Sequence, residues 1–210
     1  MRLGFIIAVC VLLFLPAAAC VAHAGANERF LTVYGPAKAP FGFRAFCERH
    51  PVSCRRAAPR QPLHLTARLW DDLDGINLEV NRSIRPMSDL DLHGVAERWS
   101  YPTSVGDCED FVLLKRQRLI ARGWPASALH ITVVKDENGV GHAVLTVRTT
   151  SGDLVLDNRT DAVVRWHALP YDFLKRQSAF DPLAWVALTP MDSALPERIV
   201  TSSGAAPAHD

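Results

Sequence analysis

The chain has 210 residues, of which 49% are hydrophobic and 21% are charged, and its formal net charge is +1 at pH 7. A chain of this length can bury the core of one domain. Because 23 basic residues nearly balance 22 acidic ones, charge gives no reason to expect nucleic acid as a partner. The sequence also contains no glycine-rich phosphate-binding motif.

The N-terminus has the organisation of a secretory signal peptide. Arg2 supplies a positive charge, residues 3–15 form an apolar run, and small residues surround an A-x-A site at residues 22–24. The run is shorter than the roughly 20 residues that cross a bilayer. We therefore predict cleavage after Ala24 and export to the periplasm. The alternatives are a short N-terminal anchor helix and a lipid anchor on Cys20.

This interpretation divides the chain into a leader, a domain and a tail. Residues 1–24 are the predicted signal peptide, and residues 25–39 are an irregular N-terminal segment that contains Pro36 and ends before Pro40. Residues 40–190 form the predicted domain, which no repeat or low-complexity linker interrupts. Residues 191–210 are predicted to be a flexible tail, because the end of the chain is small and polar.

The first half of the domain has helical patterns. Residues 41–49 predict a short helix, and the basic, proline-rich residues 52–62 predict a loop. Apolar residues recur every three or four positions over residues 69–84, which indicates an amphipathic helix. Ser88 can cap a further helix that extends to about Trp99.

Residues 108–122 predict the central helix of the domain. Gly123 supplies its stop signal. Apolar residues occur on several of its faces, which is typical of a helix that is buried on most sides. Lys115 interrupts this pattern, because it lies on the same side of the helix as Cys108.

The second half of the domain changes to strand patterns. Runs rich in β-branched residues are separated by turn signals such as Asn138-Gly139. The expected strands are residues 129–134, 140–148, 154–157 and 184–188. Helices followed by strands predict an α+β fold with an antiparallel sheet.

The cysteines separate into a pair and a single thiol. Five cysteines become three once residues 1–24 are removed. Cys47 and Cys54 would form a disulfide in an oxidising periplasm, or else remain two buried thiols. Cys108 is then left alone, either as a small buried hydrophobic residue or as a reactive thiol.

The order of Cys108, His142 and Asp157 fits nucleophilic catalysis. The thiolate is the reactive form of cysteine, and the partial positive charge of a helix N-terminus favours it. His142 could take the thiol proton and later donate it to a leaving amine. Asp157 could orient the imidazole. If the strands pair through the turn at residues 149–153, His142 and Asp157 are cross-strand neighbours, opposite or diagonal.

Three sequence blocks carry a resemblance to a known family. They read GDCED at residues 106–110, GHAVL at 141–145 and VLDN at 155–158. In this order they resemble the bacterial transglutaminase-like cysteine peptidases. Supporting stretches are Asn77 and Asn81, Trp99-Ser100-Tyr101-Pro102 and Lys175-Arg176-Gln177-Ser178.

The resemblance covers most of residues 40–190 and implies a papain-like or transglutaminase-like α+β core. Its nucleophile would lie at the N-terminus of a central helix packed on the antiparallel sheet. The implied catalytic triad is Cys108, His142 and Asp157.

One branch of this family resembles periplasmic proteases that release biofilm adhesins, and it implies further properties. These are dependence on calcium with Asp107 and Glu109 as ligands, a protein substrate such as a surface adhesin, and an inner-membrane regulatory receptor. The chain departs from this branch at residues 102–106, which lack the expected acidic residue and leave the adhesin substrate open.

The acids beside Cys108 allow two interpretations. Carboxylates next to a thiol disfavour the thiolate, so a bound cation would offset them. Alternatively, Asp107 caps the helix and Glu109 and Asp110 complement its dipole. Asn77 and Asn81 lie one helical turn apart, either lining a cleft or making structural hydrogen bonds.

The predicted function is hydrolysis of a protein by a cysteine-type peptidase through a thioester. A transglutaminase, in which an amine resolves the same thioester, and an inactive binding protein of the same fold are the alternatives.

Overall fold

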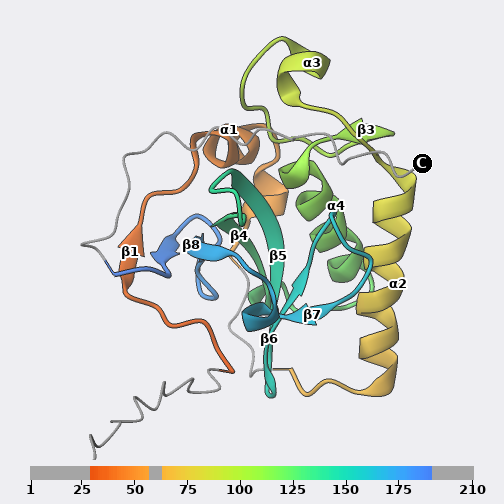
Figure 1. The fold of residues 1–210 in the computed structure, drawn as a ribbon, viewed down its shortest axis with the longest axis vertical. Coiled ribbons are helices and arrows are strands. Elements are labelled where there is room, and N and C mark those ends of the chain that lie inside the picture. The colour runs from red at the N-terminus through yellow and green to blue at the C-terminus, as the bar shows by residue number, and fades with distance from the viewer. Residues whose placement is uncertain (1–28, 57–62, 191–210) are drawn as a thin grey trace, which may run out of the picture.

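The computed structural model describes residues 29–56 and 63–190 (Figure 1). The predicted signal peptide and the predicted tail both lie outside these residues. In the part of the chain that the structure describes, no helix combines the length and hydropathy needed to cross a membrane.

A seven-stranded antiparallel sheet forms the centre of the molecule. The strand order is β1-β9-β8-β4-β5-β6-β7, so the long strands β4 and β5 lie in the middle. The predicted α+β fold is therefore confirmed. The strands are β1 (Gly35–Ala37), β4 (Leu129–Lys135), β5 (Gly141–Thr149), β6 (Gly152–Leu156), β7 (Val164–Arg165), β8 (Asp172–Gln177) and β9 (Trp185–Ala187).

Two long helices pack beside this sheet. α4 (Cys108–Ala121) contacts β5 on one side and α2 (Ala67–Ser83) on the other, and Figure 1 shows α4 between α2 and the sheet. The shorter α1 (Phe41–Arg49) packs into the same core through Phe43 and Phe46. All three helices agree with the sequence patterns.

α4 is buried on several sides, as its sequence predicts. Phe111, Val112, Leu113 and Leu119 are all almost fully buried. Burial of each large apolar side chain contributes about 1.5–3 kcal/mol to the free energy of unfolding. The helix ends before Gly123, whose φ of 92° other residues rarely adopt. The position of Cys108 at the other end is therefore held by a rigid core element.

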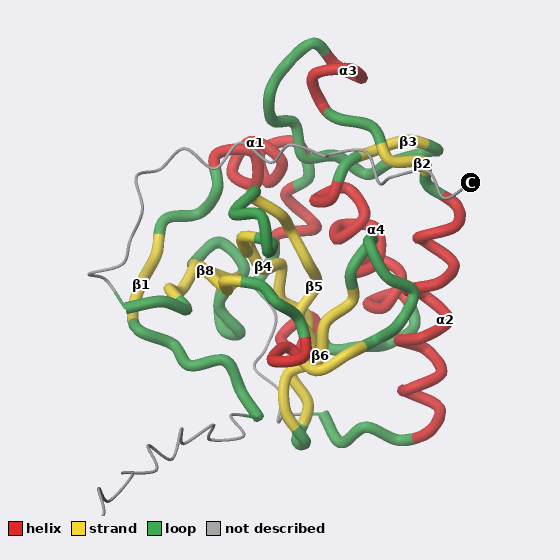
Figure 2. Tube along the Cα trace, viewed as in Figure 1, coloured by secondary structure: helices red, strands yellow, loops and turns green. Residues whose placement is uncertain are grey.

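The helix expected over residues 88–99 is much shorter than predicted. Ser88 caps α3 (Asp89–His93), accepting a hydrogen bond from the Asp91 N–H, but Gly94 ends the helix with a φ of 69°. The following residues run irregularly to β3 (Val105–Gly106), which pairs in parallel with β2 (Arg85–Pro86) (Figure 2). α3 therefore lies in a projecting loop above the N-terminal end of α4.

The predicted disulfide is confirmed. Cys47 in α1 bonds to Cys54 in the 3-10 helix η1 (Pro51–Cys54), with 5.7 Å between their Cα atoms. Cys108 is the free cysteine of the described residues.

Strand β8 was not predicted, because its pattern is polar. Arg176 and Gln177 are nevertheless buried, and each hydrogen-bonds a residue of β4. Arg176 hydrogen-bonds the His130 ring, and Gln177 accepts from the Ile131 N–H at 3.1 Å. Strand β1 likewise lies in the segment of residues 25–39 that was expected to be irregular.

Candidate active site

Cys108 is the first residue of α4 and is buried against β5. The backbone N–H of Ala143 in β5 hydrogen-bonds its sulfur. The thiol therefore lies next to the residue that follows His142. The α4 N-terminus also carries backbone N–H groups that no helical carbonyl accepts, and such groups can stabilise an oxyanion.

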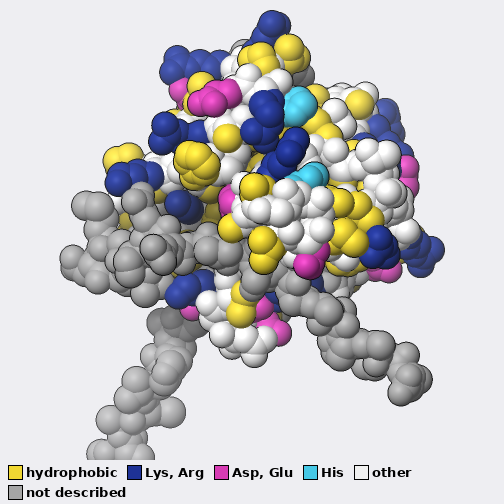
Figure 3. Space-filling model, turned by 90° about the horizontal axis from the view of Figure 1, so that it is seen from above, with side chains coloured by type: hydrophobic (Ala, Val, Ile, Leu, Met, Phe, Trp, Pro, Cys, Tyr) yellow, Lys and Arg dark blue, Asp and Glu magenta, His cyan; other side chains and the backbone are white. Residues whose placement is uncertain are grey.

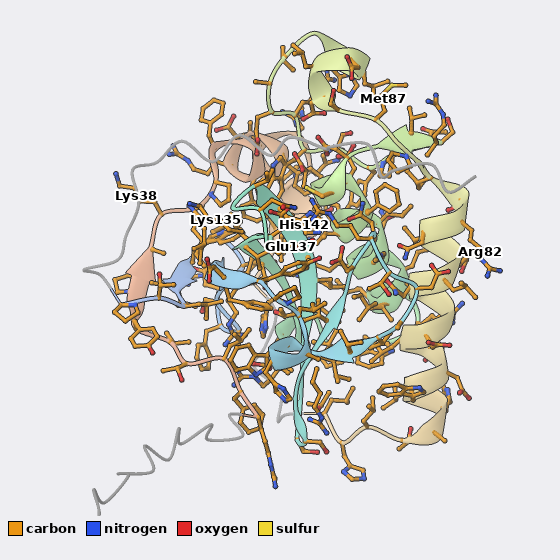
Figure 4. The ribbon with its side chains drawn as sticks, in the orientation of Figure 1. Lys38, Arg82, Met87, Lys135, Glu137 and His142 are labelled. Atoms are coloured by element: carbon orange, nitrogen blue, oxygen red, sulfur yellow. A yellow bond between two sulfur atoms is a disulfide. The ribbon has the colours of Figure 1, made fainter. Side chains whose placement is uncertain are left out.

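His142 and Asp157 form a buried hydrogen-bonded pair. The distance from His142 Nε2 to Asp157 Oδ1 is 2.9 Å. Extending the β5–β6 ladder by one residue places Asp157 opposite Val144, so it is diagonal to His142. This arrangement confirms the predicted cross-strand neighbourhood. Because Nε2 contacts the carboxylate, Nδ1 is the ring nitrogen left to exchange a proton with a thiol. Figure 4 labels His142 near the first turns of α4.

Asp157 is held by two further donors. The Tyr171 hydroxyl donates to Oδ2 at 2.8 Å, and the Arg159 N–H donates to Oδ1 at 3.0 Å. Burial alone would raise the pKa of Asp157, but its hydrogen bond to His142 and these donors lower it to about 2. The carboxylate is therefore ionised at neutral pH and can orient the imidazole.

Tyr171 is a member of the site that no pattern in the sequence indicates. Its ring lies edge-on to His142, with 5.8 Å between the centroids. It precedes β8, whose polar sequence gave no strand signal, so no local pattern linked it to Asp157.

Three buried carboxylates gather beside the thiol. One oxygen each of Asp89, Asp107 and Glu109 lies within 4.8 Å of the others. Figure 3 views the molecule from above, and only scattered acidic side chains are visible on that face. Because Asp89, Asp107 and Glu109 are at most 2% exposed, the cluster is an interior feature and not a solvated acidic surface.

Asp107 does not act as the helix cap that one interpretation expected. It occupies the N-cap position of α4, but its side chain makes no capping hydrogen bond. Neither carboxylate oxygen of Asp107 has a partner at hydrogen-bond geometry, although the Glu109 carboxyl lies close to Asp107. Burial and the charge of Asp89 raise the pKa of Asp107 to about 7. Both Asp107 oxygens are therefore buried among carboxylates without a hydrogen-bond partner.

Cys108 lies in an unfavourable electrostatic position for a thiolate. Burial and then the charges of Glu109 and Asp107 raise the pKa of the thiol, while the Ala143 N–H opposes them. The thiol donates to Glu109 Oε2 at 3.1 Å. Burial and the charge of Asp107 also raise the pKa of Glu109 well above its usual value.

The three-carboxylate donor set fits a calcium ion, which prefers oxygen ligands. The buried Asp107 oxygens without donors are the observation that supports this fit. Asp89 was missed as a member, because the fold of the loop from β2 to β3, and not sequence spacing, brings it to Asp107. Its Oδ2 also accepts the Arg98 N–H, which ties the loop to the cluster.

The glycine of the GDCED block is required by close packing. A Cβ atom at Gly106 would lie 2.7 Å from Asp110 Oδ2 and 2.8 Å from Asp110 Cβ. Asp110 accepts the Ser100 N–H at 2.7 Å, and burial raises its pKa to about 8. Asp110 therefore fixes the approach to Cys108.

A family model described as "Bacterial transglutaminase-like cysteine proteinase BTLCP" matches residues 33–193. The chain belongs to this family. The matched range contains every residue of the site described above.

Solved structures similar to this proteinase come from Legionella pneumophila. The calcium-bound LapG structure has a TM-score of 0.50 and 26% identity, and covers 60% of this chain and 74% of that chain. This match supports a transglutaminase-like fold. A second LapG structure has a TM-score of 0.47 and 26% identity, and covers 53% of this chain. An EGTA-treated LapG structure has a TM-score of 0.48 and 26% identity, and covers 59% of this chain.

The proteinase spans 64% of the first LapG chain, which is less than two thirds, and 68% of the EGTA-treated one. No curated protein matches its sequence significantly.

Asn77 and Asn81 of the proteinase make structural hydrogen bonds. Asn77 donates to the carbonyl oxygens of Thr160 and Asp161, and Asn81 donates to that of Asp157 at 3.0 Å. These contacts favour the structural interpretation of the two asparagines, because they join α2 to the loop that begins at Asp157.

Proposed function

We propose that the chain is an exported cysteine peptidase that cleaves a periplasmic or surface protein through a thioester acyl-enzyme. Cys108 is the nucleophile, His142 the general acid and base, and Asp157 the residue that orients His142. The observation that carries this proposal is the 2.9 Å hydrogen bond between His142 in β5 and Asp157, the residue after β6, beside a free thiol at a helix N-terminus.

The reaction begins when the Nδ1 atom of His142 accepts the thiol proton. The sulfur of Cys108 attacks the scissile carbonyl carbon, and N–H groups at the start of α4 stabilise the oxyanion. The intermediate collapses to a thioester as His142 donates the proton to the leaving amine. Water, deprotonated by His142, then cleaves the thioester and regenerates the thiol.

Calcium is part of the proposal, with Asp89, Asp107 and Glu109 as its ligands. A bound divalent cation would supply positive charge that offsets the three carboxylates. Glu109 and Asp107 would then no longer disfavour the Cys108 thiolate. The calcium-bound LapG structure, which has the same fold, supports this part of the proposal.

The substrate class follows from the family and from the predicted export. We propose a protein substrate in or beyond the periplasm, with a surface adhesin as the leading candidate. We also propose an inner-membrane receptor as the regulator. Cleavage of the signal peptide after Ala24 is part of the same proposal and places the mature enzyme in the periplasm.

The decisive experiment compares surface and secreted proteins from a parent strain, a deletion strain and a strain that carries only Cys108→Ala. A substrate should persist uncut in the last two strains. The purified mature chain should then cleave that substrate, and Cys108→Ala and His142→Ala should abolish cleavage without loss of the fold. Full cleavage by a folded Cys108→Ala protein would falsify the mechanism.

The acyl acceptor is tested separately. The enzyme is incubated with the substrate and a fluorescent primary amine, and the products are analysed by mass spectrometry. Hydrolysis yields two fragments without label. Covalent attachment of the amine to glutamine side chains would instead assign a transglutaminase.

A further inference from the structure

Asp136 organises the turn between β4 and β5, which leads to His142. The Oδ1 atom of Asp136 accepts the N–H of Asn138 at 2.9 Å and the N–H of Val140 at 2.8 Å. An aspartate that accepts backbone N–H groups of the following residues stabilises a turn. Because Val140 lies two residues before His142, this carboxylate fixes the start of the strand that carries the proposed base.

The second oxygen of Asp136 pairs with Arg159 in the loop after β6. Arg159 Nη1 donates to Asp136 Oδ2 at 2.8 Å. The Asp136 side chain is 4% exposed and that of Arg159 is 34% exposed, so solvent screens this ion pair only in part. A hydrogen bond between two charged groups is also stronger than one between neutral groups. The pair therefore joins the loop after β6 to the β4–β5 turn.

Arg159 also contacts the proposed orienting acid. Its backbone N–H donates to Asp157 Oδ1 at 3.0 Å, which closes a local turn and makes the carboxylate and the Arg159 backbone one unit. The same Oδ1 atom hydrogen-bonds His142 Nε2 at 2.9 Å. A shift of the Arg159 backbone would therefore move the oxygen that holds the imidazole.

These contacts connect His142 and Asp157 by a second route besides their own hydrogen bond. The second route runs from Asp157 to Arg159 and on to Asp136. It returns from Asp136 through the N–H of Val140 and along the chain to His142. The ion pair thus restrains the loop and the β4–β5 turn against movement relative to each other.

Asp157 needs this restraint because it lies just beyond the paired part of β6. The β5–β6 ladder ends one residue earlier, so strand pairing does not hold the residues that follow. Asn81 donates to the backbone oxygen of Asp157 from α2, and Tyr171 donates to its Oδ2. Neither of these two hydrogen bonds involves the β4–β5 turn. The ion pair supplies that link to the hairpin that carries the proposed base.

We propose that Arg159 is a positioning residue for Asp157, and that its ion pair with Asp136 keeps this carboxylate aligned with His142. The inference rests on the proposed function, because it assigns a role in a mechanism that uses Cys108, His142 and Asp157. Arg159 acts through Asp157 and is not itself a catalytic residue. Loss of the ion pair should therefore leave the fold intact and misalign the imidazole.

The test uses the mature full-length chain with Asp136→Asn. An asparagine oxygen can still accept the N–H groups of the turn, but the amide nitrogen beside it cannot accept from Arg159. The matched control is Asp72→Asn, which removes a pair of 2.9 Å with Arg122 at the other end of α4 from Cys108. Thermal unfolding of both variants measures the general loss of stability from a broken ion pair.

The first readout is hydrogen exchange at the Arg159 amide, which donates to Asp157 Oδ1. We expect exchange there to be about fivefold faster in Asp136→Asn than in Asp72→Asn at equal global stability, because the loop is no longer held to the turn. This readout requires no substrate and no reactive thiol. Equal exchange rates in the two variants would overturn the proposal.

The second readout is the rate at which iodoacetamide alkylates Cys108 as a function of pH, with calcium present. Arg159→Gln and Asp136→Asn should each lower the rate about fivefold near neutral pH, because a misaligned imidazole stabilises the thiolate less. The lost rate should return at higher pH. Arg122→Gln should keep the profile of the parent protein, and Arg159→Lys should retain more of the rate than Arg159→Gln. An unchanged profile in folded Arg159→Gln protein contradicts the positioning role.

The double variant Arg159→Gln/Asp136→Asn tests whether the two residues act together. Because either change alone removes the same ion pair, the double variant should react at most about twofold more slowly than the slower single variant. Effects that multiply would show that the two residues act independently, and the proposal would then be wrong.

The two proposals fail in different ways. If the parent thiol is not alkylated near neutral pH, the proposed function fails, and exchange at the Arg159 amide still decides whether the ion pair holds the loop. If Asp136→Asn does not fold, Arg159→Gln replaces it in the exchange measurement, because Arg159 lies at the surface. Exchange at position 159 equal to that of the control, after correction for the residue type, would then reject the proposal.

Discussion

The sulfur of Cys108 lies 3.1 Å from Oε2 of Glu109, and this thiol, the nucleophile of the proposed mechanism, donates a hydrogen bond to the adjacent carboxylate. Burial and two neighbouring acids raise the pKa of this thiol, whereas the chemistry requires a thiolate. A cation held by Asp89, Asp107 and Glu109, as proposed, would therefore change the reactivity of the thiol.

Calcium should activate the thiol. Addition of calcium to chelator-treated protein is expected to raise the rate of Cys108 alkylation at pH 7 at least tenfold, because the cation offsets the adjacent negative charge. Asp89→Asn should weaken this response. The control is Asp91→Asn, since Asp91 is exposed on the same short helix and bonds Ser88 instead of the cluster. A calcium response in Asp89→Asn equal to that of the control would remove Asp89 from the site.

Asp157→Ala should slow catalysis by about 100-fold, because His142 loses the partner that orients it. Tyr171→Phe should cost much less, about a few-fold, because only one of the contacts to Asp157 is lost. The measurement is kcat on the identified substrate, with KM determined in parallel. If Asp157→Ala keeps the kcat of the parent, Asp157 has no orienting role.

The stability of the protein should depend on Asp157 at acid pH. The pKa of this group is about 2 in the folded protein and 3.8 as the ordinary value. The depressed pKa contributes about 2 kcal/mol to the unfolding free energy above pH 4, and this contribution is lost as pH falls toward 2. Urea unfolding between pH 7 and 3 checks this, with Asp157→Asn as the reference. The difference between the two proteins should shrink on acidification, and a constant difference would contradict the assignment.

Gly106→Ala should destabilise the protein by about 1–3 kcal/mol, because its Cβ would overlap Asp110. The control is Gly75→Ala in α2, where a Cβ meets nothing within 4 Å. That change should raise the unfolding free energy by about 0.5–1 kcal/mol, since alanine favours a helix. Denaturant unfolding of both variants measures the contrast. Equal effects would show that the glycine is not required by packing.

The sequence predicted most of the helices and strands that are marked by local apolar spacing or by turn residues. Apolar spacing located α2 and α4, and turn signals separated β4, β5 and β6. It overestimated the helix after Ser88, because Gly94 ends α3 by adopting a left-handed conformation. It missed β8, because the polar residues Arg176 and Gln177 are buried through hydrogen bonds to β4, which is distant in the sequence.

For the site, the sequence by itself determined the order of Cys108, His142 and Asp157, since helix starts and strand alternation are local properties of the chain. Only the tertiary structure decided which groups share the site with them. Asp89 reaches it from the loop that carries α3, and Tyr171 reaches it from the position just before β8. Their roles depend on burial and on charge interactions between segments that are distant in the sequence. No residue spacing along the chain indicates that these segments lie close together.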